Sequence, residues 1–137
     1  LMRRRIIACV LATDMIHHSK QLQYLKIKSE SLGIDKGFNS NKILENLDSV
    51  DLFNTQQEYL NIFLHISDIS NPTKNWVVYE EWSKRVMNEF WKQGDEEKRL
   101  NLPISFLCNR ETVKISSAQI GFIEGIVCPI YSLTINN

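Results

Sequence analysis

Apolar residues recur along this chain at the spacing of an α-helix, and this periodicity constrains its fold more than any other feature. From Met2 to about Lys26 the spacings are three, four or seven residues, set by Ile7, Leu11, Met15, Leu22 and Leu25. Residues 75–93 repeat the pattern, with one face formed by Tyr79, Trp82, Val86 and Phe90. Such spacing places side chains on one side of a helix. No segment alternates as a strand does, so the sequence predicts an all-α fold.

Turn-forming residues set the expected limits of the first helices. Gly33 and Gly37 predict a loop over residues 29–40, followed by a short helix over 41–47. Asp51 can cap a further helix that runs to about Ile69. The proline at position 72 stops that helix, because the residue before a proline is disfavoured in the helical region.

The second half of the chain is divided in the same way. Gly94 is expected to end the helix over 75–93, and residues 102–115 are expected to form an irregular loop. Ser116 or Ser117 can cap a last helix that runs to about Leu133. A kink is expected at Pro129, because proline removes one helical hydrogen bond.

Composition excludes several classes of partner. The 137 residues carry 16 Lys and Arg against 16 Asp and Glu, and this balance argues against binding to nucleic acid or an anionic membrane surface. Three scattered cysteines suit neither a disulfide framework nor a Cys-x-x-Cys metal site, so we expect reduced thiols and a cytoplasmic protein. No apolar stretch is long enough to span a bilayer.

A few polar residues fall where apolar ones are expected. Asp68 lies at the end of an apolar helix, either facing water or serving as a functional carboxylate. Asp14 and His18 are four residues apart, so a structural Asp–His pair is the simpler interpretation. His65 is better interpreted as a core histidine with a hydrogen-bond partner than as a metal ligand.

The residues alone do not assemble a complete catalytic site. A catalytic zinc ion needs three protein ligands, and two of the three histidines, His17 and His18, are adjacent and point in different directions on a helix. Gln119 and Phe122 lie three residues apart and could grip a flat ligand with a polar edge. The alternative is that Phe122 simply belongs to the core.

Five segments in series resemble one family. They are Leu11–Met15, Ser67–Lys74, Tyr79-x-x-Trp82, Glu89-Phe90 with Gln93–Asp95, and Gln119–Ile123. Their order and spacing, from about Ile6 to Tyr131, closely resemble the catalytic domain of class I 3′,5′-cyclic nucleotide phosphodiesterases. The resemblance implies an all-helical metallohydrolase that converts cAMP or cGMP to the 5′-monophosphate. It implies a zinc ion and a second divalent cation, magnesium or manganese, which together activate a hydroxide, while a histidine protonates the leaving oxygen.

The resemblance also assigns roles to individual residues. Asp68 matches a zinc ligand, and Thr13 matches a residue that bonds metal-bound water. Gln119 matches the residue that bonds the purine edge, and Phe122 matches the ring that stacks on the base. The remaining matches are expected to line the base pocket: Asn71, Tyr79, Trp82, Ser83, Val86, Phe90 and Leu107.

Part of the family pattern is missing from this sequence. The His-Asn-x-x-His segment and the His-Asp pair, which supply the proton donor and the other metal ligands, do not occur. We therefore expect residues 1–137 to be the C-terminal part of one catalytic domain, with no catalytic residue in this chain and no activity in isolation. The alternative is a catalytically inactive helical module that binds nucleotides or a partner. The choice between cAMP and cGMP, homodimerisation and membrane anchoring stay open.

Overall fold

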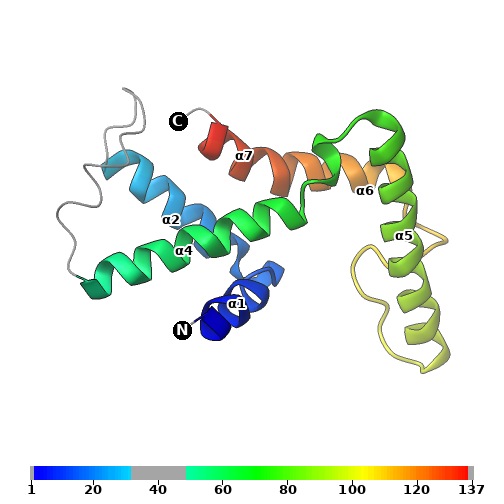
Figure 1. Ribbon diagram of the computed structural model, residues 1–137. Helices are drawn as coiled ribbons and strands as arrows, with labels where there is room; N and C mark the ends of the chain where they lie inside the picture. Colours follow the sequence, from blue (N-terminus) through cyan, green and yellow to red (C-terminus); the bar gives the residue numbers. More distant parts are fainter. Residues whose placement is uncertain (1, 32–48, 136–137) are drawn as a thin grey trace. The chain divides into compact units, whose positions relative to one another are not determined.

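Helices make up the computed structural model, which describes residues 2–31 and 49–135 and contains no strand within those ranges. The prediction of an all-α fold is confirmed (Figure 1). The chain forms two units. The first comprises Leu1–Ile69 with Pro129–Asn137, and the second comprises Ser70–Cys128. Within the described residues no helix is long and apolar enough to cross a membrane.

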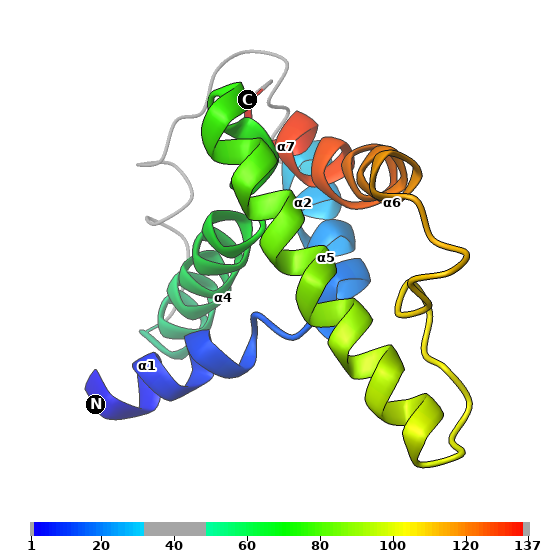
Figure 2. The same ribbon diagram turned by 90° about the vertical axis from the view of Figure 1, so that its right-hand side faces the viewer.

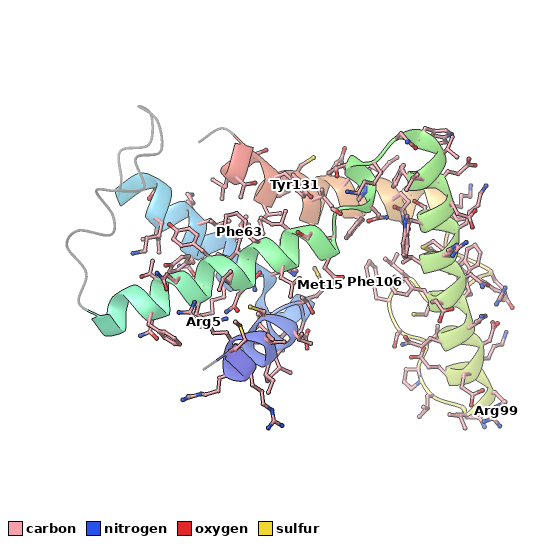
Figure 3. All side chains as sticks on the ribbon, in the orientation of Figure 1. Arg5, Met15, Phe63, Arg99, Phe106 and Tyr131 are labelled. Atoms are coloured by element: carbon pink, nitrogen blue, oxygen red, sulfur yellow. The ribbon has the colours of Figure 1, made fainter. Side chains whose placement is uncertain are left out.

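The first unit is built around α4 (Ser49–Asp68), which packs against α1 (Met2–Leu11) (Figure 1). The Arg5 guanidinium lies 4.3 Å from the centre of the Phe53 ring, so a cation–π contact joins the two helices. α7 (Cys128–Ile135) contributes the fully buried Ile130. The hydroxyl of Tyr131 donates to the Ile66 carbonyl at 3.2 Å, which ties α7 to α4 (Figure 3).

The predicted single helix over residues 2–26 is wrong, because the chain breaks after Leu11. A short 3-10 turn, η1 (Met15–His17), precedes α2 (His18–Ser31). The Thr13 hydroxyl donates to the Val10 carbonyl at 2.8 Å, and Asp14 Oδ1 accepts from the Ile16 backbone at 2.9 Å. These side chains replace backbone helical bonds, which is how Thr and Asp interrupt helices. The apolar spacing runs through the break and therefore does not reveal it.

A buried pair of histidines joins α2 to α4. His18 Nδ1 and His65 Nε2 lie 3.0 Å apart, and the two residues are 5% and 0% exposed. The core position predicted for His65 is confirmed. The predicted Asp14–His18 pair is not formed within the described residues, because Asp14 caps η1 instead. The outer ring nitrogen of His18, Nε2, is buried without a hydrogen-bond partner in the described part of the chain.

The second unit contains η3 (Asn71–Thr73), α5 (Trp76–Arg99), α6 (Ile115–Phe122) and the π-turn η4 (Ile123–Val127). The predicted stop before Pro72 is confirmed. α5 begins after Asn75, whose Oδ1 accepts from the Val78 backbone at 3.1 Å as an N-cap. The chain between α5 and α6 is irregular, as predicted, and returns from the end of α5 to α6 (Figure 2).

The prediction that Gly94 ends a helix is wrong. α5 continues to Arg99 and stops where Asn101 adopts a φ of 55°, a left-handed conformation that Asn tolerates. Gly94 is buried within the helix, and a Cβ added there would lie 1.9 Å from the Cys108 carbonyl oxygen. The glycine therefore allows the loop after α5 to lie directly on the helix backbone.

Other predicted boundaries differ in detail. α4 begins at Ser49, so Asp51 lies inside it, and Ser29 belongs to α2 rather than to a loop. The predicted helix over 41–47 and most of the loop before it lie outside the described residues. α6 begins at Ile115 without a serine cap, and η4 replaces a continuous helix just before Pro129. Since Pro129 has no backbone N–H to donate, a widened turn at this place suits it.

We predict that Gly94→Ala destabilises the chain by at least about 1–3 kcal/mol, because the new methyl group meets a backbone carbonyl that cannot move aside alone. Gly121→Ala is the matched control, because that helical glycine has open space around its added Cβ. The control should be neutral or stabilising by up to about 1 kcal/mol. Urea denaturation of the three proteins measures this, and equal midpoints for the two variants would contradict the close contact.

We also predict that stability falls as pH drops below the ordinary histidine range. Burial lowers the pKa of both His18 and His65 from the ordinary value of 6.5. The charge of His65 lowers the pKa of His18 further. The Thr13 backbone and the Asp68 carboxylate oppose the shift at His65 without cancelling it. The unfolded chain then binds more protons than the folded one below about pH 6.5, so the free energy of unfolding decreases from there downward.

Denaturant midpoints between about pH 8 and pH 5 measure this dependence. His18→Gln, which removes one titrating ring and retains hydrogen-bonding groups, should flatten the slope. His17→Gln, at an exposed neighbouring position, is the control and should leave it unchanged. An unaltered slope in His18→Gln would show that the buried pair is not its source.

Candidate functional site

Three of the predicted base-pocket residues meet in the second unit. Gln119 on α6 faces Tyr79 and Ser83 on α5, one turn apart. The Tyr79 hydroxyl lies 3.1 Å from Gln119 Oε1, and the Ser83 hydroxyl lies 3.3 Å from the same atom. Gln119 is half-buried and lies within hydrogen-bond reach of both hydroxyl groups. We name Tyr79, Ser83 and Gln119 the amide cluster.

The tyrosine is the principal donor in the amide cluster. Ser83 has a single hydroxyl proton, and its closer acceptor is the Tyr79 carbonyl at 2.8 Å. Tyr79 has no such competitor within the described residues, so its phenol donates to Gln119 Oε1. With the oxygen engaged, Gln119 Nε2 retains its two hydrogens for a ligand. The amide therefore has a defined orientation before any ligand binds.

The other predicted pocket residues differ in exposure. Trp82 and Phe90 are exposed on α5, whereas Val86, Asn71 and Phe122 are half-buried. These positions supply aromatic and aliphatic surface on α5 and α6, which carry the amide cluster, together with one amide on η3.

Leu107 lies in the loop after α5, with a φ of 65°. A left-handed conformation is unfavourable for a bulky branched side chain, which distinguishes Leu107 from Asn101, the other residue of this loop with a positive φ. The preceding residue, Phe106, is 89% exposed (Figure 3). Leu107 itself is half-buried.

Asp68 and Thr13 belong to the first unit. Asp68 is the last residue of α4 and is exposed, and its carboxylate forms no hydrogen bond or ion pair within the described residues. A carboxylate at the C-terminal end of a helix meets the negative end of the helix dipole, so helix stability does not account for it. The half-buried Thr13 donates its proton to Val10, which leaves its oxygen free to accept from water.

Among the described residues, Asp68 is not part of a group of side chains that could together hold a metal ion. Nowhere in residues 2–31 and 49–135 do three His, Cys, Asp or Glu side chains gather closely enough to hold an ion. His18 and His65 are buried and hydrogen-bonded to each other. An exposed carboxylate oxygen is a ligand that zinc and magnesium both accept. Asp68 therefore fits as a single ligand, and the described residues do not form a complete metal centre.

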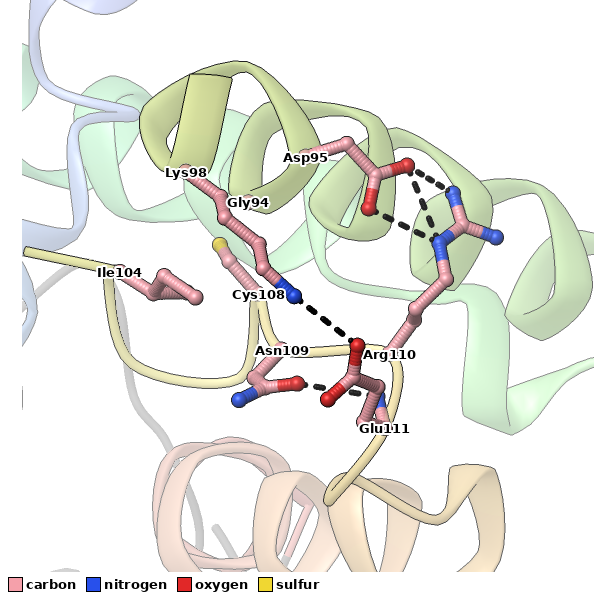
Figure 4. Close-up of a pocket in the computed structure, with 8 residues that line it drawn as sticks. All are labelled: Gly94, Asp95, Lys98, Ile104, Cys108, Asn109, Arg110 and Glu111. Carbon is pink, nitrogen blue, oxygen red and sulfur yellow. Dashed lines mark hydrogen bonds and ion pairs between the residues drawn. The ribbon is translucent and has the colours of Figure 1, made fainter. Parts of the chain in front are cut away.

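A small pocket elsewhere in the second unit is closed by ion pairs (Figure 4). Its volume is about 50 Å³, and none of the predicted site residues lines it. Arg110 pairs with Asp95 at 2.5 Å, and Lys98 pairs with Glu111 at 3.0 Å, so its charged groups already have partners. We interpret this pocket as the place where the loop is fastened to α5. The sequence did not predict these pairs, because 13 and 15 residues separate the partners.

Comparison with known proteins gives a consistent result. Residues 1–136 match the family described as 3'5'-cyclic nucleotide phosphodiesterase. A probable 3',5'-cyclic-AMP phosphodiesterase, pde-4, from Caenorhabditis elegans is 40% identical over 94% of this chain and 18% of its own length. The human dual specificity calcium/calmodulin-dependent 3',5'-cyclic nucleotide phosphodiesterase 1B is 38% identical over 96% of this chain and 21% of its own.

A solved structure of LmjPDEB1 in complex with IBMX superposes with a TM-score of 0.78 and 26% identity, covering 98% of this chain and 36% of that one. The chain thus spans about a fifth of the length of the curated relatives it matches. The family match covers nearly every residue, and the solved structure has a similar fold. The chain belongs to the 3',5'-cyclic nucleotide phosphodiesterase family.

Proposed function

We propose that this chain is part of an enzyme that hydrolyses 3′,5′-cyclic nucleotides to 5′-monophosphates. In this proposal it supplies the contacts to the nucleotide base and one metal ligand. The observation that carries the proposal is the amide cluster, in which the Tyr79 hydroxyl engages Gln119 Oε1 at 3.1 Å within a chain that matches the family throughout. The free cysteines are consistent with a cytoplasmic location.

Gln119 would read the edge of the purine ring. Its Nε2 hydrogens can be accepted by N1 of adenine or by O6 of guanine, so this contact alone suits both bases. Phe122 would stack on the base, and Tyr79, Trp82, Ser83, Val86, Phe90, Asn71 and Leu107 would line the pocket. Aromatic and aliphatic walls with one oriented amide are typical of sites that bind a flat ring with polar edges.

Asp68 would provide a carboxylate oxygen to a zinc ion, next to a second divalent cation, magnesium or manganese. Bound divalent ions supply activation of water and stabilisation of charge on the phosphoryl oxygens. The oxygen of Thr13, whose own proton is directed to Val10, would accept a hydrogen bond from a nearby water and orient it. The further ligands and the proton donor would come from other parts of a longer protein.

The second candidate is a catalytically inactive module that retains nucleotide binding. It is supported by the lack of any group of three metal-binding side chains in the described residues. The two candidates differ in whether the gene encodes the His-Asn-x-x-His segment and the His-Asp pair upstream of Leu1. Their presence would favour the enzyme, and their replacement by non-ligating residues would favour the module.

We predict that Asp68→Ala, in a longer family protein that carries this segment, lowers metal-dependent hydrolysis of cAMP or cGMP by more than about a hundredfold. Losing groups that merely support a ligand already costs about 10- to 100-fold. Zinc content by atomic absorption should fall in parallel with turnover. Glu58→Ala removes a carboxylate from the same helix and is the control. Unchanged turnover and zinc content in Asp68→Ala would contradict the proposal that Asp68 binds zinc.

We predict that Gln119→Ala weakens nucleotide binding by about tenfold, since it deletes the amide that would bond the base. Tyr79→Phe should weaken binding less, because Gln119 remains but loses its main orienting bond. Dissociation constants for cAMP and cGMP, with melting temperatures measured alongside, separate binding from folding. A large fall in the melting temperature of Gln119→Ala with unchanged affinity would show that the cluster is only structural.

A further inference from the structure

The first turn of α5 exposes an unusual amount of apolar surface. Trp76 is 68% exposed and Val77 is 75% exposed, directly after the Asn75 cap. Because most of the Trp76 side chain is exposed, its burial contributes little to stability. Packing in the core therefore does not account for a tryptophan at this position. Neither the family resemblance nor the motifs in the sequence assigned Trp76 a role.

Trp76 contacts one ring in the described part of the chain, and that ring belongs to the amide cluster. The Trp76 and Tyr79 rings have centroids 5.9 Å apart and an interplanar angle of 71°, which is an edge-to-face arrangement. The two residues are three positions apart and therefore share a face of α5. At its other end, the Tyr79 ring carries the hydroxyl that donates to Gln119 Oε1.

We propose that Trp76 is a positioning residue that braces the Tyr79 ring, so that its hydroxyl keeps the Gln119 amide in one orientation. The role in purine choice rests on the proposed function, whereas the brace itself does not. When the pocket walls hold the base in one place, a fixed Nε2 donor favours the purine that presents an acceptor at that place, whereas an amide that can rotate accommodates either purine. Ser83 cannot fix it alone, because its proton is drawn to the nearer Tyr79 carbonyl.

Replacing Trp76 is expected to have a modest effect on the orientation of Gln119, and the variants are expected to remain folded. Edge-to-face pairs contribute an amount that corresponds to about a two- to tenfold change in an equilibrium. Trp76 is mostly exposed, so replacing it should change the melting temperature little. Trp76→Leu removes the ring but keeps apolar bulk, and Trp76→Phe keeps a ring. Val77→Ala is the control, since Val77 is the more exposed neighbour.

The first experiment uses the 137-residue chain without nucleotide. The side-chain amide signals of Gln119 in a nitrogen-15 proton correlation spectrum report on its hydrogen bonds. Trp76→Leu should shift them in the same direction as Tyr79→Phe, whereas Trp76→Phe and Val77→Ala should leave them near the wild-type position. Gln119 signals in Trp76→Leu that coincide with those of the wild type would overturn the brace.

The second experiment places the same substitutions in a longer family protein that carries this segment, and titrates each protein with cAMP and with cGMP in the absence of divalent ions. Trp76→Leu should bring the ratio of the two dissociation constants about two- to tenfold closer to one, with partial recovery in Trp76→Phe. A ratio equal to that of the wild type, despite shifted Gln119 signals, would overturn the role in purine choice. If the unsubstituted longer protein binds neither nucleotide, the proposed function of the cluster is contradicted, and the Gln119 signals still decide the brace.

Discussion

In the second unit, the number of available hydroxyl protons determines which hydrogen bonds can form between α5 and α6. Two acceptor oxygens, the Tyr79 carbonyl and Gln119 Oε1, lie within hydrogen-bond reach of two hydroxyl groups, those of Tyr79 and Ser83, which have one proton each. Because Ser83 lies closer to the carbonyl, the phenol of Tyr79 is the principal hydrogen-bond donor from α5 to α6. That single bond both joins the two helices and leaves the amide nitrogen available, so packing and recognition would use the same contact.

Hydropathy spacing predicted the all-α class and the positions of the main helices, because burial of one face leaves a period that is visible in sequence. It did not predict the break at Thr13 and Asp14, since the polar side chains that interrupt the helix leave the apolar spacing intact. The wrong limit at Gly94 has a different cause. Its partner, the Cys108 carbonyl, is distant in sequence, so the sequence alone does not distinguish a glycine needed for close approach from one that ends a helix.

The candidate site was predictable to a similar degree. Tyr79 and Ser83 share a helix face by spacing alone, whereas Gln119 joins them only through tertiary packing that spacing does not encode. For the same reason the partner of His18 was predicted to be Asp14, four residues away, and is instead His65 on another helix. Asp68, in contrast, is a residue that the sequence alone singles out. Its place at the negative end of a helix dipole opposes local stability, and such conflicts are concentrated at functional positions.

The close contact between Gly94 and Cys108 makes the loop after α5 observable through thiol chemistry. Cys108 is buried, and burial raises the pKa of its thiol, so the reactive thiolate is scarce while the loop is in place. Cys128 is exposed on the same chain and provides an internal reference. Alkylation of Cys108 requires the loop to leave α5, and its rate relative to Cys128 therefore measures how often the ion-paired loop opens.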